Sequence, residues 1–327
     1  MKNILLSILG CLMIIGSSGW AAAEEQIVIR WSDVLSPPNP HPLMMEKVAE
    51  IVAEKSNGRI EIQVYPGGQL GSSRDTIESL SLGMHEMATE GVSHLESWYP
   101  AVNAIQTMPY IYKDPAHVQR VLESPIGREI LETIREKSGI RVLGAAYYGK
   151  RNVTTSSKEI NAVDDMAGFK LRVPESAVYI AFAKAWGAKP TPISFGELYL
   201  ALKQSVVDGQ ENPLPTIWSA KFYEVQKYLV LTGHILDWRA VLINEEFFQS
   251  LSPEDQTLLA DAVKEGIAWC NETILQQEAE LVEKLQAEGM TVIEPDVDSF
   301  RSAVLEKVPA EFKDKWGDLI EKIVAID

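Results

Sequence analysis

The sequence predicts an α/β protein, and three observations support this prediction. Segments with the two-residue period of a strand alternate with segments of helical spacing along the first two thirds of the chain. The 327 residues suggest roughly two domains of about 150 residues each. One helical pattern near the C-terminus, from Ser252 to about Leu285, would be about 50 Å long at about 1.5 Å per residue. That length exceeds one small domain, so we expect this helix to cross two lobes.

The first part of the chain alternates strand and helix. We expect, in order, a strand at Ile27 to Ser32, a helix at His41 to Lys55, a strand at Ile60 to Tyr65, and a helix capped by Ser72 or Ser73 that runs toward Leu82. Asn57-Gly58 ends the first helix, and Pro66-Gly67-Gly68 supplies the turn after the second strand. This order is typical of an open sheet with helices on its faces.

The middle of the chain continues the pattern with shorter elements. They are the end of a strand at Met87 to Thr89, one helical segment at Val118 to Lys137, a strand at Ile140 to Tyr148, a short helix near Asp164-Asp165, a strand at Lys170 to Val173, a short strand within Gly187 to Pro192 and a helix at Phe195 to Lys203. Asp208 to Pro213 is interpreted as a polar loop held by Gly209 and Pro213, with Asp208 and Glu211 fixing its shape. The aromatic residues that follow are expected to form a helix face that packs within a lobe: Trp218, Phe222, Tyr223 and Tyr228.

The N-terminus has the pattern of a secretory signal peptide. Met1-Lys2-Asn3 is a short basic start, Ile4 to Gly16 is nearly all apolar, and Ala21 to Ala23 gives a small-residue cleavage site. We expect residues 1–23 to be removed by cleavage after about Ala23. The apolar run is shorter than the roughly 20 residues of a membrane span, and it continues past Cys11, which disfavours a lipoprotein.

Charge and cysteine content limit the partners. The formal net charge of −16 disfavours nucleic acid and anionic lipid, because both need clustered Lys and Arg. No later segment is long and apolar enough to span a bilayer, so we expect an exported, soluble protein without direct membrane insertion. One cysteine, Cys270, remains after export, which predicts no internal disulfide and a buried or half-buried thiol.

No motif in the sequence supports an enzyme. The chain lacks G-x-S-x-G, G-x-x-x-x-G-K-[ST] and H-E-x-x-H. Its histidines have no metal-ligand spacing, so we expect neither a metal nor a cofactor: His41, His85, His94, His117 and His234. Four glutamates would act as acid and base only if the fold paired them, and glutamates on solvated helices are far more common: Glu78, Glu86, Glu90 and Glu96.

Binding residues are better supported than catalytic ones. Arg172 in "KLRVP" ends an apparent strand, and ligands of open α/β sheets gather outside the carboxyl ends of strands. A guanidinium there can hold a carboxylate through two parallel hydrogen bonds, and a surface salt bridge is the alternative. Arg151 follows the strand that ends in Tyr147-Tyr148-Gly149 and offers a second cation. Asn212 offers an amide that both donates and accepts.

Several stretches together resemble one known family. "GFKLRVP", "GAKPTPISFGELYLALKQSVVDGQENP" and "KFYEVQKYLVLTGHI" closely resemble the extracytoplasmic solute-binding subunits of tripartite ATP-independent periplasmic (TRAP) transporters, the DctP-type family. "IEIQVYPGGQLGSSRD" extends the likeness toward the N-terminus, and the order of segments is similar to the sialic-acid-binding branch. The resemblance implies a two-lobed periplasmic solute-binding protein fold, with hinge strands and a long lobe-spanning helix, that closes over one organic acid.

The resemblance also implies boundaries and partners. It suggests lobe I at residues 24–148 plus 238–277 and lobe II at residues 149–237 plus 278–327. Members of the family are not enzymes. Their closed form delivers the ligand to the small and large membrane subunits of a permease, and a sodium gradient drives uptake.

Four site residues are implied in the second half of the binding region. Arg172 matches the family's arginine that forms a two-pronged salt bridge with the ligand carboxylate. Arg151 matches a second ligand arginine of the sialic-acid branch. Asn212 matches a polar residue that also touches the carboxylate, and Phe195 matches an aromatic lining position.

Three further residues fall where that branch places polar ligand contacts. Glu90 fits directly, whereas Asp33 stands where an asparagine is expected and Ser73 stands where an acid is expected. These departures argue against sialic acid and leave a polar pocket suited to hydroxyl groups. Trp238, together with Asp237, follows "TGHIL". The indole either enters the crevice, which would favour a smaller ligand such as a hexuronate, or packs in the lobe core.

We therefore expect the ligand to be a small sugar acid such as a uronate, or another hydroxy carboxylate. An arginine clamp also accepts C4-dicarboxylates and sulfonates, which remain alternative ligands. Two alternative functions remain: a binding subunit that reports to a sensor kinase, and an exported enzyme that acts on sugar acids.

Overall fold

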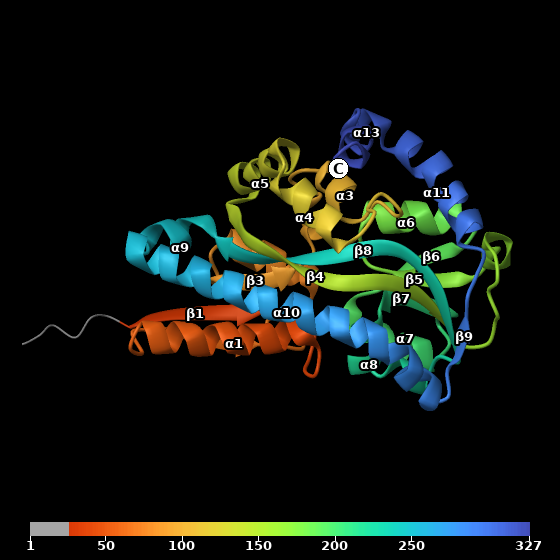
Figure 1. Cartoon of the computed structure of the whole chain (residues 1–327), viewed down its shortest axis with the longest axis horizontal. Helices are drawn as coiled ribbons and strands as arrows, with labels where there is room; N and C mark the ends of the chain where they lie inside the picture. The colour runs from red at the N-terminus through yellow and green to blue at the C-terminus, as the bar shows by residue number, and fades with distance from the viewer. Residues whose placement is uncertain (1–25) are drawn as a thin grey trace, which may run out of the picture.

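The computed structural model describes residues 26–327, which form one mixed sheet with helices on both faces (Figure 1). The predicted signal peptide, residues 1–23, lies outside the described residues. Across residues 26–327 the sheet has nine strands in the order β2-β1-β3-β8-β4-β7-β5-β6, and β9 pairs with β8. The strands are β1 (Ile27–Ser32), β2 (Ile60–Tyr65), β3 (Met87–Glu90), β4 (Ile140–Thr155), β5 (Lys170–Val173), β6 (Lys189–Pro192), β7 (Gly209–Pro213), β8 (Tyr228–Asn244) and β9 (Thr291–Ile293).

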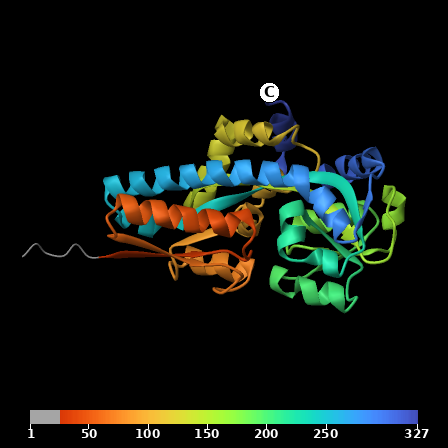
Figure 2. The ribbon, with the colours of Figure 1, turned by 60° about the horizontal axis from the view of Figure 1, so that its bottom comes forward.

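Two long antiparallel strands, β4 and β8, join two groups of short strands. On one side β1 runs parallel to β2 and β3, and β3 pairs antiparallel with β8. On the other side β5 runs parallel to β6 and β7, and β7 pairs antiparallel with β4. We call the elements around β1–β3 the first lobe and those around β5–β7 the second lobe. Figure 2 shows the two lobes at opposite ends of the molecule.

The helices cover both faces of this sheet. They are α1 (Pro40–Lys55), α2 (Ser73–Ser81), α3 (Val102–Gln106), α4 (Pro115–Glu123), α5 (Pro125–Ser138), α6 (Ala177–Ala185), α7 (Phe195–Lys203), α8 (Leu214–Ser219), α9 (Glu245–Ser250), α10 (Pro253–Ala287), α11 (Val297–Glu311), α12 (Lys313–Trp316) and α13 (Leu319–Val324). Short 3-10 turns lie at Val92–Leu95, Val163–Met166 and Phe222–Glu224. Alternate side chains of β8 pack on opposite faces of the sheet. Ala240 and Leu242 belong to one core cluster, and Val241 and Ile243 belong to another.

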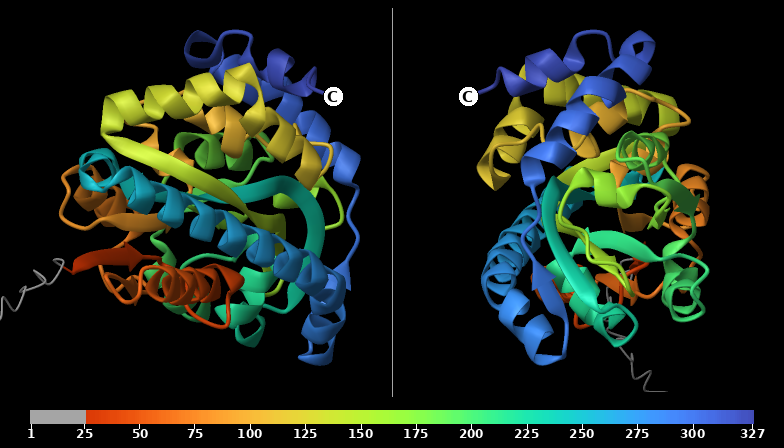
Figure 3. Two further views of the ribbon diagram at one scale, coloured as in Figure 1. Left: turned by 60° about the vertical axis from the view of Figure 1, so that its left-hand side comes forward. Right: turned by 90° about the vertical axis from the view of Figure 1, so that its right-hand side faces the viewer.

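Helix α10 crosses both lobes, as the sequence predicts. Ser252 caps it by accepting from the backbone N–H of Asp255, and 35 residues follow. Its first part contributes Leu259 and Cys270 to the core of the first lobe, and its last part contributes Leu281 and Leu285 to the core of the second lobe. Figure 3 shows α10 lying across β4 and β8. Cys270 is fully buried, as expected.

Most predicted elements are present, but three interpretations are wrong. Val118 to Lys137 is not one helix, because Ser124 and Pro125 end α4 and start α5. Residues 209–213 are not a loop but strand β7, which is buried between β4 and β5. The aromatic segment is not one helix face, because α8 ends at Ser219 and β8 begins at Tyr228. The strand predicted to end at Tyr148 continues to Thr155, and helix α6 was not predicted.

Substitution of Gly266 tests the contact between α1 and α10. A Cβ at this position would lie 2.4 Å from Val48 Cγ2 and 3.2 Å from Met44 Cγ. Overpacking costs about 1–3 kcal/mol and outweighs the roughly 1 kcal/mol by which alanine favours a helix. Gly266→Ala is therefore expected to lower the free energy of unfolding in a urea titration.

Gly196→Ala is the matched control, because Gly196 lies in α7 and a Cβ added there would meet no atom within 4 Å. This variant should be as stable as the native protein, or more stable by up to about 1 kcal/mol. Equal stability of both variants would show that α1 and α10 do not pack as closely as described.

Candidate ligand-binding site

A polar cavity lies between the lobes, at the carboxyl ends of parallel strands from both. It offers about 80 Å³ to the centres of water-sized molecules. From the first lobe it is lined by Leu35 after β1 and by Glu90 at the end of β3. From the second lobe it is lined by Arg172 in β5 and by Phe195 at the start of α7. The cavity thus occupies the position where open α/β sheets bind ligands.

The structure brings most of the predicted site residues to this cavity. Those that line it are Arg172, Arg151, Asn212, Glu90, Phe195, Ser73 and Asp237. Asp33 does not line it, but Arg239 Nη1 binds both oxygens of its carboxylate at 2.8 Å, and Arg239 does line it. Trp238 stays outside: its indole is 1% exposed and donates to the carbonyl of Ile105. The expectation that Trp238 enters the crevice is therefore corrected, and the indole packs in the core.

Arg172 is a buried cation that forms no ion pair with a carboxylate of residues 26–327. The residue is 3% exposed, and its Nε donates to the carbonyl of Ile193 at 2.8 Å. Among residues 26–327, no hydrogen bond or ion pair engages its two terminal nitrogens. Burial, together with the neighbouring Arg151, lowers the pKa of Arg172 to about 10 against the pull of Glu211, so the group stays charged at neutral pH. The two terminal nitrogens of this guanidinium can therefore donate hydrogen bonds to the anionic group of a ligand.

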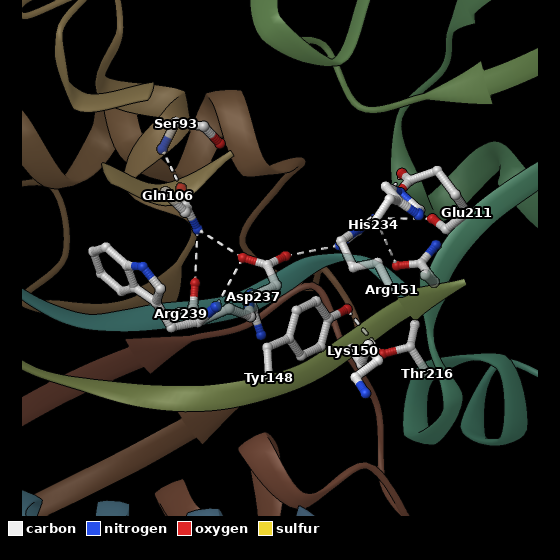
Figure 4. A network of polar contacts seen from close by, with 12 residues as sticks. Ser93, Gln106, Tyr148, Lys150, Arg151, Glu211, Thr216, His234, Asp237 and Arg239 are labelled. Atoms are coloured by element: carbon white, nitrogen blue, oxygen red, sulfur yellow. Dashed lines mark hydrogen bonds and ion pairs between the residues drawn. The ribbon is translucent and has the colours of Figure 1, made fainter. Parts of the chain in front are cut away.

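Arg151 is held in a different way, inside an internal ion cluster (Figure 4). Its Nε and Nη2 donate to the two carboxylate oxygens of Glu211 at 2.5 and 2.7 Å. Its Nη1 donates to Asp237 at 2.9 Å, and Nη2 also reaches the side-chain oxygen of Asn212 at 3.2 Å. A guanidinium has five N–H groups, so one hydrogen on Nη1 remains for a ligand.

Glu211 was expected to fix the shape of a loop, and this expectation is wrong. It is the main carboxylate partner of Arg151 in this ion cluster. It is fully buried in β7, and it accepts from Arg151 and contacts His234 Nε2 at 3.1 Å. Burial opposes its charge, but Arg151 and His234 hold the pKa of Glu211 below its usual value. Burial raises the pKa of Asp237, with Arg151 opposing the shift. Gln106 of the first lobe reaches this cluster, because its Nε2 donates to Asp237 Oδ1 at 3.4 Å and to the neighbouring carbonyl of Trp238 at 2.7 Å (Figure 4).

A second cluster lies on the first-lobe side, and its central residue, Arg239, was missed from the sequence. It consists of Arg239 with Asp33 and Glu90, which we call the acidic cluster. Arg239 Nη2 donates to the carbonyl of Thr89 and lies 3.4 Å from Glu90 Oε2. Burial raises the pKa of Asp33 to about 7 and also raises the pKa of Glu90, while Arg239 opposes both shifts. The signal that could have revealed Arg239 is a charged residue within the apolar run "HILDWRAVLIN", which predicts a buried ion partner.

Two further findings limit the chemistry of the described part of the chain. Between residues 26 and 327, no helix is long and apolar enough to cross a membrane. In the same range, no group of three or more His, Cys, Asp or Glu side chains could hold a metal ion.

A two-lobed α/β fold with a polar cavity between the lobes and an unpaired arginine inside it defines a binding protein for an anionic solute. The family model described as "Bacterial extracellular solute-binding protein, family 7" (DctP) matches residues 31–315. The chain belongs to this family of solute-binding transport proteins.

Relatives whose ligands are known share the whole fold. The sialic acid-binding periplasmic protein SiaP of Vibrio cholerae is 39% identical over 280 residues, which cover 85% of this chain and 86% of that protein. A TRAP periplasmic solute-binding protein of Roseobacter denitrificans with bound L-galactonate has a TM-score of 0.88 and 31% identity, covering 93% of this chain and 100% of that one. A TRAP protein of Sulfurospirillum deleyianum with bound succinate has a TM-score of 0.87 and 27% identity, covering 93% and 100%. These similarities confirm the two-lobed fold.

Proposed function

We propose that the chain is the exported solute-binding subunit of a TRAP transporter and captures a small sugar acid or another hydroxy carboxylate. One observation carries this proposal: the buried guanidinium of Arg172 lines the cavity with both terminal nitrogens unpaired among the described residues. A carboxylate can accept two parallel hydrogen bonds from these nitrogens. The free hydrogen of Arg151 Nη1 and the amide of Asn212 complete this end of the site.

The size of the cavity supports a small ligand. About 80 Å³ of the cavity is open to the centres of water-sized molecules, so the cavity can hold several waters that a ligand would displace. A short polyhydroxy acid, such as the L-galactonate bound to the Roseobacter protein, would displace waters of this kind. Lobe closure then removes the remaining water and strengthens each hydrogen bond.

The proposed lobe boundaries fall where strands β4 and β8 pass from one lobe to the other, and this is where we expect the hinge. We keep residues 24–148 plus 238–277 as lobe I and residues 149–237 plus 278–327 as lobe II, except at the C-terminus. Residues 312–327 contact lobe I, because Trp316 Nε1 donates to the carbonyl of Pro100 at 3.3 Å and Lys113 pairs with Asp327 at 3.1 Å. The register of β4 against β8 shifts between Tyr147 and Gly149, which pair with Trp238 and Asp237. Gly149 has φ +116°, a conformation that favours glycine. A bulge with a glycine locally loosens a strand, so both proposed crossings lie where β4 and β8 can bend.

Contacts on two sides of the cavity hold the lobes together. Asn39 of lobe I donates to Thr216 Oγ1 of lobe II at 3.3 Å. Glu96 of lobe I accepts from the hydroxyl of Ser176 and from the backbone N–H of Ala177, each at 3.2 Å. Ala177 is the first residue of α6, where a carboxylate also interacts favourably with the helix dipole. Because each contact joins the two lobes, we expect opening of the lobes to break it.

Glu96→Ala is expected to weaken ligand binding about fivefold, although Glu96 does not line the cavity. Loss of about 1 kcal/mol from the closed state lowers its population, and the apparent affinity falls with it. Isothermal titration calorimetry measures the change. Glu136→Ala on the exposed face of α5 is the control and should leave Kd unchanged. A Glu96→Ala protein with native Kd would show that this contact does not favour closure.

Export and delivery complete the proposed function. Residues 1–23 would direct secretion, with cleavage after about Ala23, and the mature protein would pass its ligand to the small and large permease subunits. The protein needs no catalysis for this function, so a ligand recovered from it by mass spectrometry should be chemically unchanged. Turnover of a sugar acid by the purified protein would instead support an enzyme.

A thermal-shift screen tests the function directly. The panel contains sugar acids, C4-dicarboxylates, sulfonates and 2-oxo acids. A ligand at about 100 times its Kd should add about 2.7 kcal/mol of stability and raise Tm clearly. A panel in which no anion raises Tm would contradict the proposal.

A further inference from the structure

Tyr148 occupies the point at which β4 passes from one lobe to the other. In the ladder between β4 and β8, Tyr147 and Gly149 have paired partners and Tyr148 has none, so Tyr148 is the extra residue of a bulge. Its side chain is 6% exposed and lines the cavity. The proposed hinge and the proposed ligand site therefore meet at this one side chain.

The ring of Tyr148 faces one guanidinium from each lobe. Arg151 of lobe II places its Cζ 5.9 Å from the ring centre, and Arg239 of lobe I places its Cζ 5.5 Å from the same ring. Both distances are within the roughly 6 Å over which an aromatic face attracts a cation. Burial raises the pKa of Tyr148 although both arginines oppose the shift, so the phenol is neutral at neutral pH. Movement of one lobe against the other would take at least one guanidinium away from the ring.

The hydroxyl of Tyr148 ends a chain of hydrogen bonds between the lobes. Asn39 Nδ2 of lobe I donates to Thr216 Oγ1 of lobe II at 3.3 Å. The Thr216 hydroxyl in turn donates to the phenol oxygen of Tyr148 at 2.9 Å, and Figure 4 shows the two hydroxyl groups directed toward each other. Thr216 is fully buried in α8, which belongs to lobe II. Opening of the lobes would therefore break this chain.

We propose that Tyr148 is a positioning residue that couples ligand binding to lobe closure. The proposal rests on the proposed function, because it assumes that a carboxylate ligand binds in the cavity that Tyr148 lines. Closure brings Arg151, Arg239 and the Thr216 hydroxyl to the same side chain. A ligand in the cavity excludes water from these contacts and strengthens them. The ligand and Tyr148 therefore stabilise the same state, and each gains from the other.

Removal of the hydroxyl tests one half of this coupling. Tyr148→Phe keeps the ring, and Kd for the tightest-binding acid of the thermal-shift screen should rise about fivefold in calorimetry, because one hydrogen bond of the closed state is lost. Thr216→Val loses the bonds to both Tyr148 and Asn39, so its Kd should rise at least as much. The double variant should bind no more weakly than Thr216→Val alone. Multiplication of the two single effects in the double variant would overturn the hydrogen-bond chain.

Removal of the ring tests the other half. Tyr148→Leu keeps an apolar side chain but offers no face to the two guanidiniums, and Kd should rise about tenfold or more. Tyr65→Phe is the control, because the Tyr65 hydroxyl bonds to Gln63 within β2, away from the cavity, and its loss should leave Kd unchanged. Native Kd in both Tyr148 variants would overturn the proposal.

A distance between the lobes distinguishes coupling from simple contact with the ligand. Spin labels at Leu82→Cys after α2 and at Lys203→Cys in α7 lie on exposed positions of lobes I and II, and the buried Cys270 stays unlabelled. Saturating ligand should move the native distance distribution to the closed value. The two Tyr148 variants should retain an open fraction at saturation. Weaker binding with full closure at saturation would overturn the proposal and make Tyr148 an ordinary ligand contact.

Failure of this proposal is distinguishable from failure of the proposed function. Carboxylate binding that depends on Arg172 but not on Tyr148 leaves the proposed function intact and overturns only the coupling. Absence of binding by every carboxylate tested on the native protein would contradict both.

Discussion

Replacing Arg172 with alanine is expected to weaken binding of the preferred acid roughly 100- to several-thousand-fold, while the protein stays folded. Removing one partner of a buried charge pair costs about 3–5 kcal/mol, because the other charge remains in a site that excludes water. The terminal nitrogens of Arg172 have no partner among the described residues, so the alanine variant breaks no internal ion pair. The Tm of the ligand-free variant should equal or exceed the native value, since burial already disfavours this cation.

Two variants separate geometry from charge in this test. Arg172→Lys keeps the positive charge but offers no planar fork, so its affinity should fall between those of the native protein and the alanine variant. Arg301→Ala removes an exposed arginine that pairs with Asp298 at 3.1 Å, and it should leave Kd unchanged. Native affinity in Arg172→Ala, measured by calorimetry, would rule out Arg172 as the carboxylate site.

Replacing Glu211 with alanine is expected to destabilise the fold more than any other single carboxylate substitution discussed above. Glu211 is fully buried, and its removal leaves Arg151 with Asp237 as its remaining carboxylate partner. Breaking a buried ion pair costs about 3–5 kcal/mol. At about 2–4 °C per kcal/mol, Tm should fall by about 6–20 °C. Differential scanning calorimetry without ligand measures this change.

Glu224→Ala provides the control for this loss of stability. Glu224 is exposed, and its carboxylate accepts from the hydroxyl of Tyr199 at 2.7 Å. Surface substitutions of this kind usually change stability by no more than about 0.5 kcal/mol. A Glu211→Ala protein as stable as Glu224→Ala would show that the ion cluster around Arg151 contributes little to folding.

The helices and the edge strands could be predicted because their signals are local. Ser252 with Pro253 marks the start of α10, and Ser72 marks that of α2, since each serine caps its helix through its own side chain. Strand β7 could not be recognised, because the segment from Gly209 to Pro213 is polar and resembles a turn. Its polar side chains are buried because they bond to residues on neighbouring strands, such as Gln210 to Thr154.

Site residues with a local sequence signal could also be predicted, whereas their ion-pair partners could not. Arg172 lies two residues before a proline at the end of a strand, and this local position predicts that its side chain reaches the site. The partners of Arg151 and Arg239 depend on the register of distant strands. Arg151 meets Glu211 only because β4 pairs with β7, and Arg239 meets Asp33 across 206 positions of sequence. No local pattern contains that information.

A crystal structure of the protein with the tightest-binding sugar acid from the thermal-shift screen tests the central claim most directly. The account predicts the ligand carboxylate within hydrogen-bond distance of both terminal nitrogens of Arg172, with a ligand hydroxyl donating to Glu90. A carboxylate bound elsewhere, with the terminal nitrogens of Arg172 facing water, would contradict it.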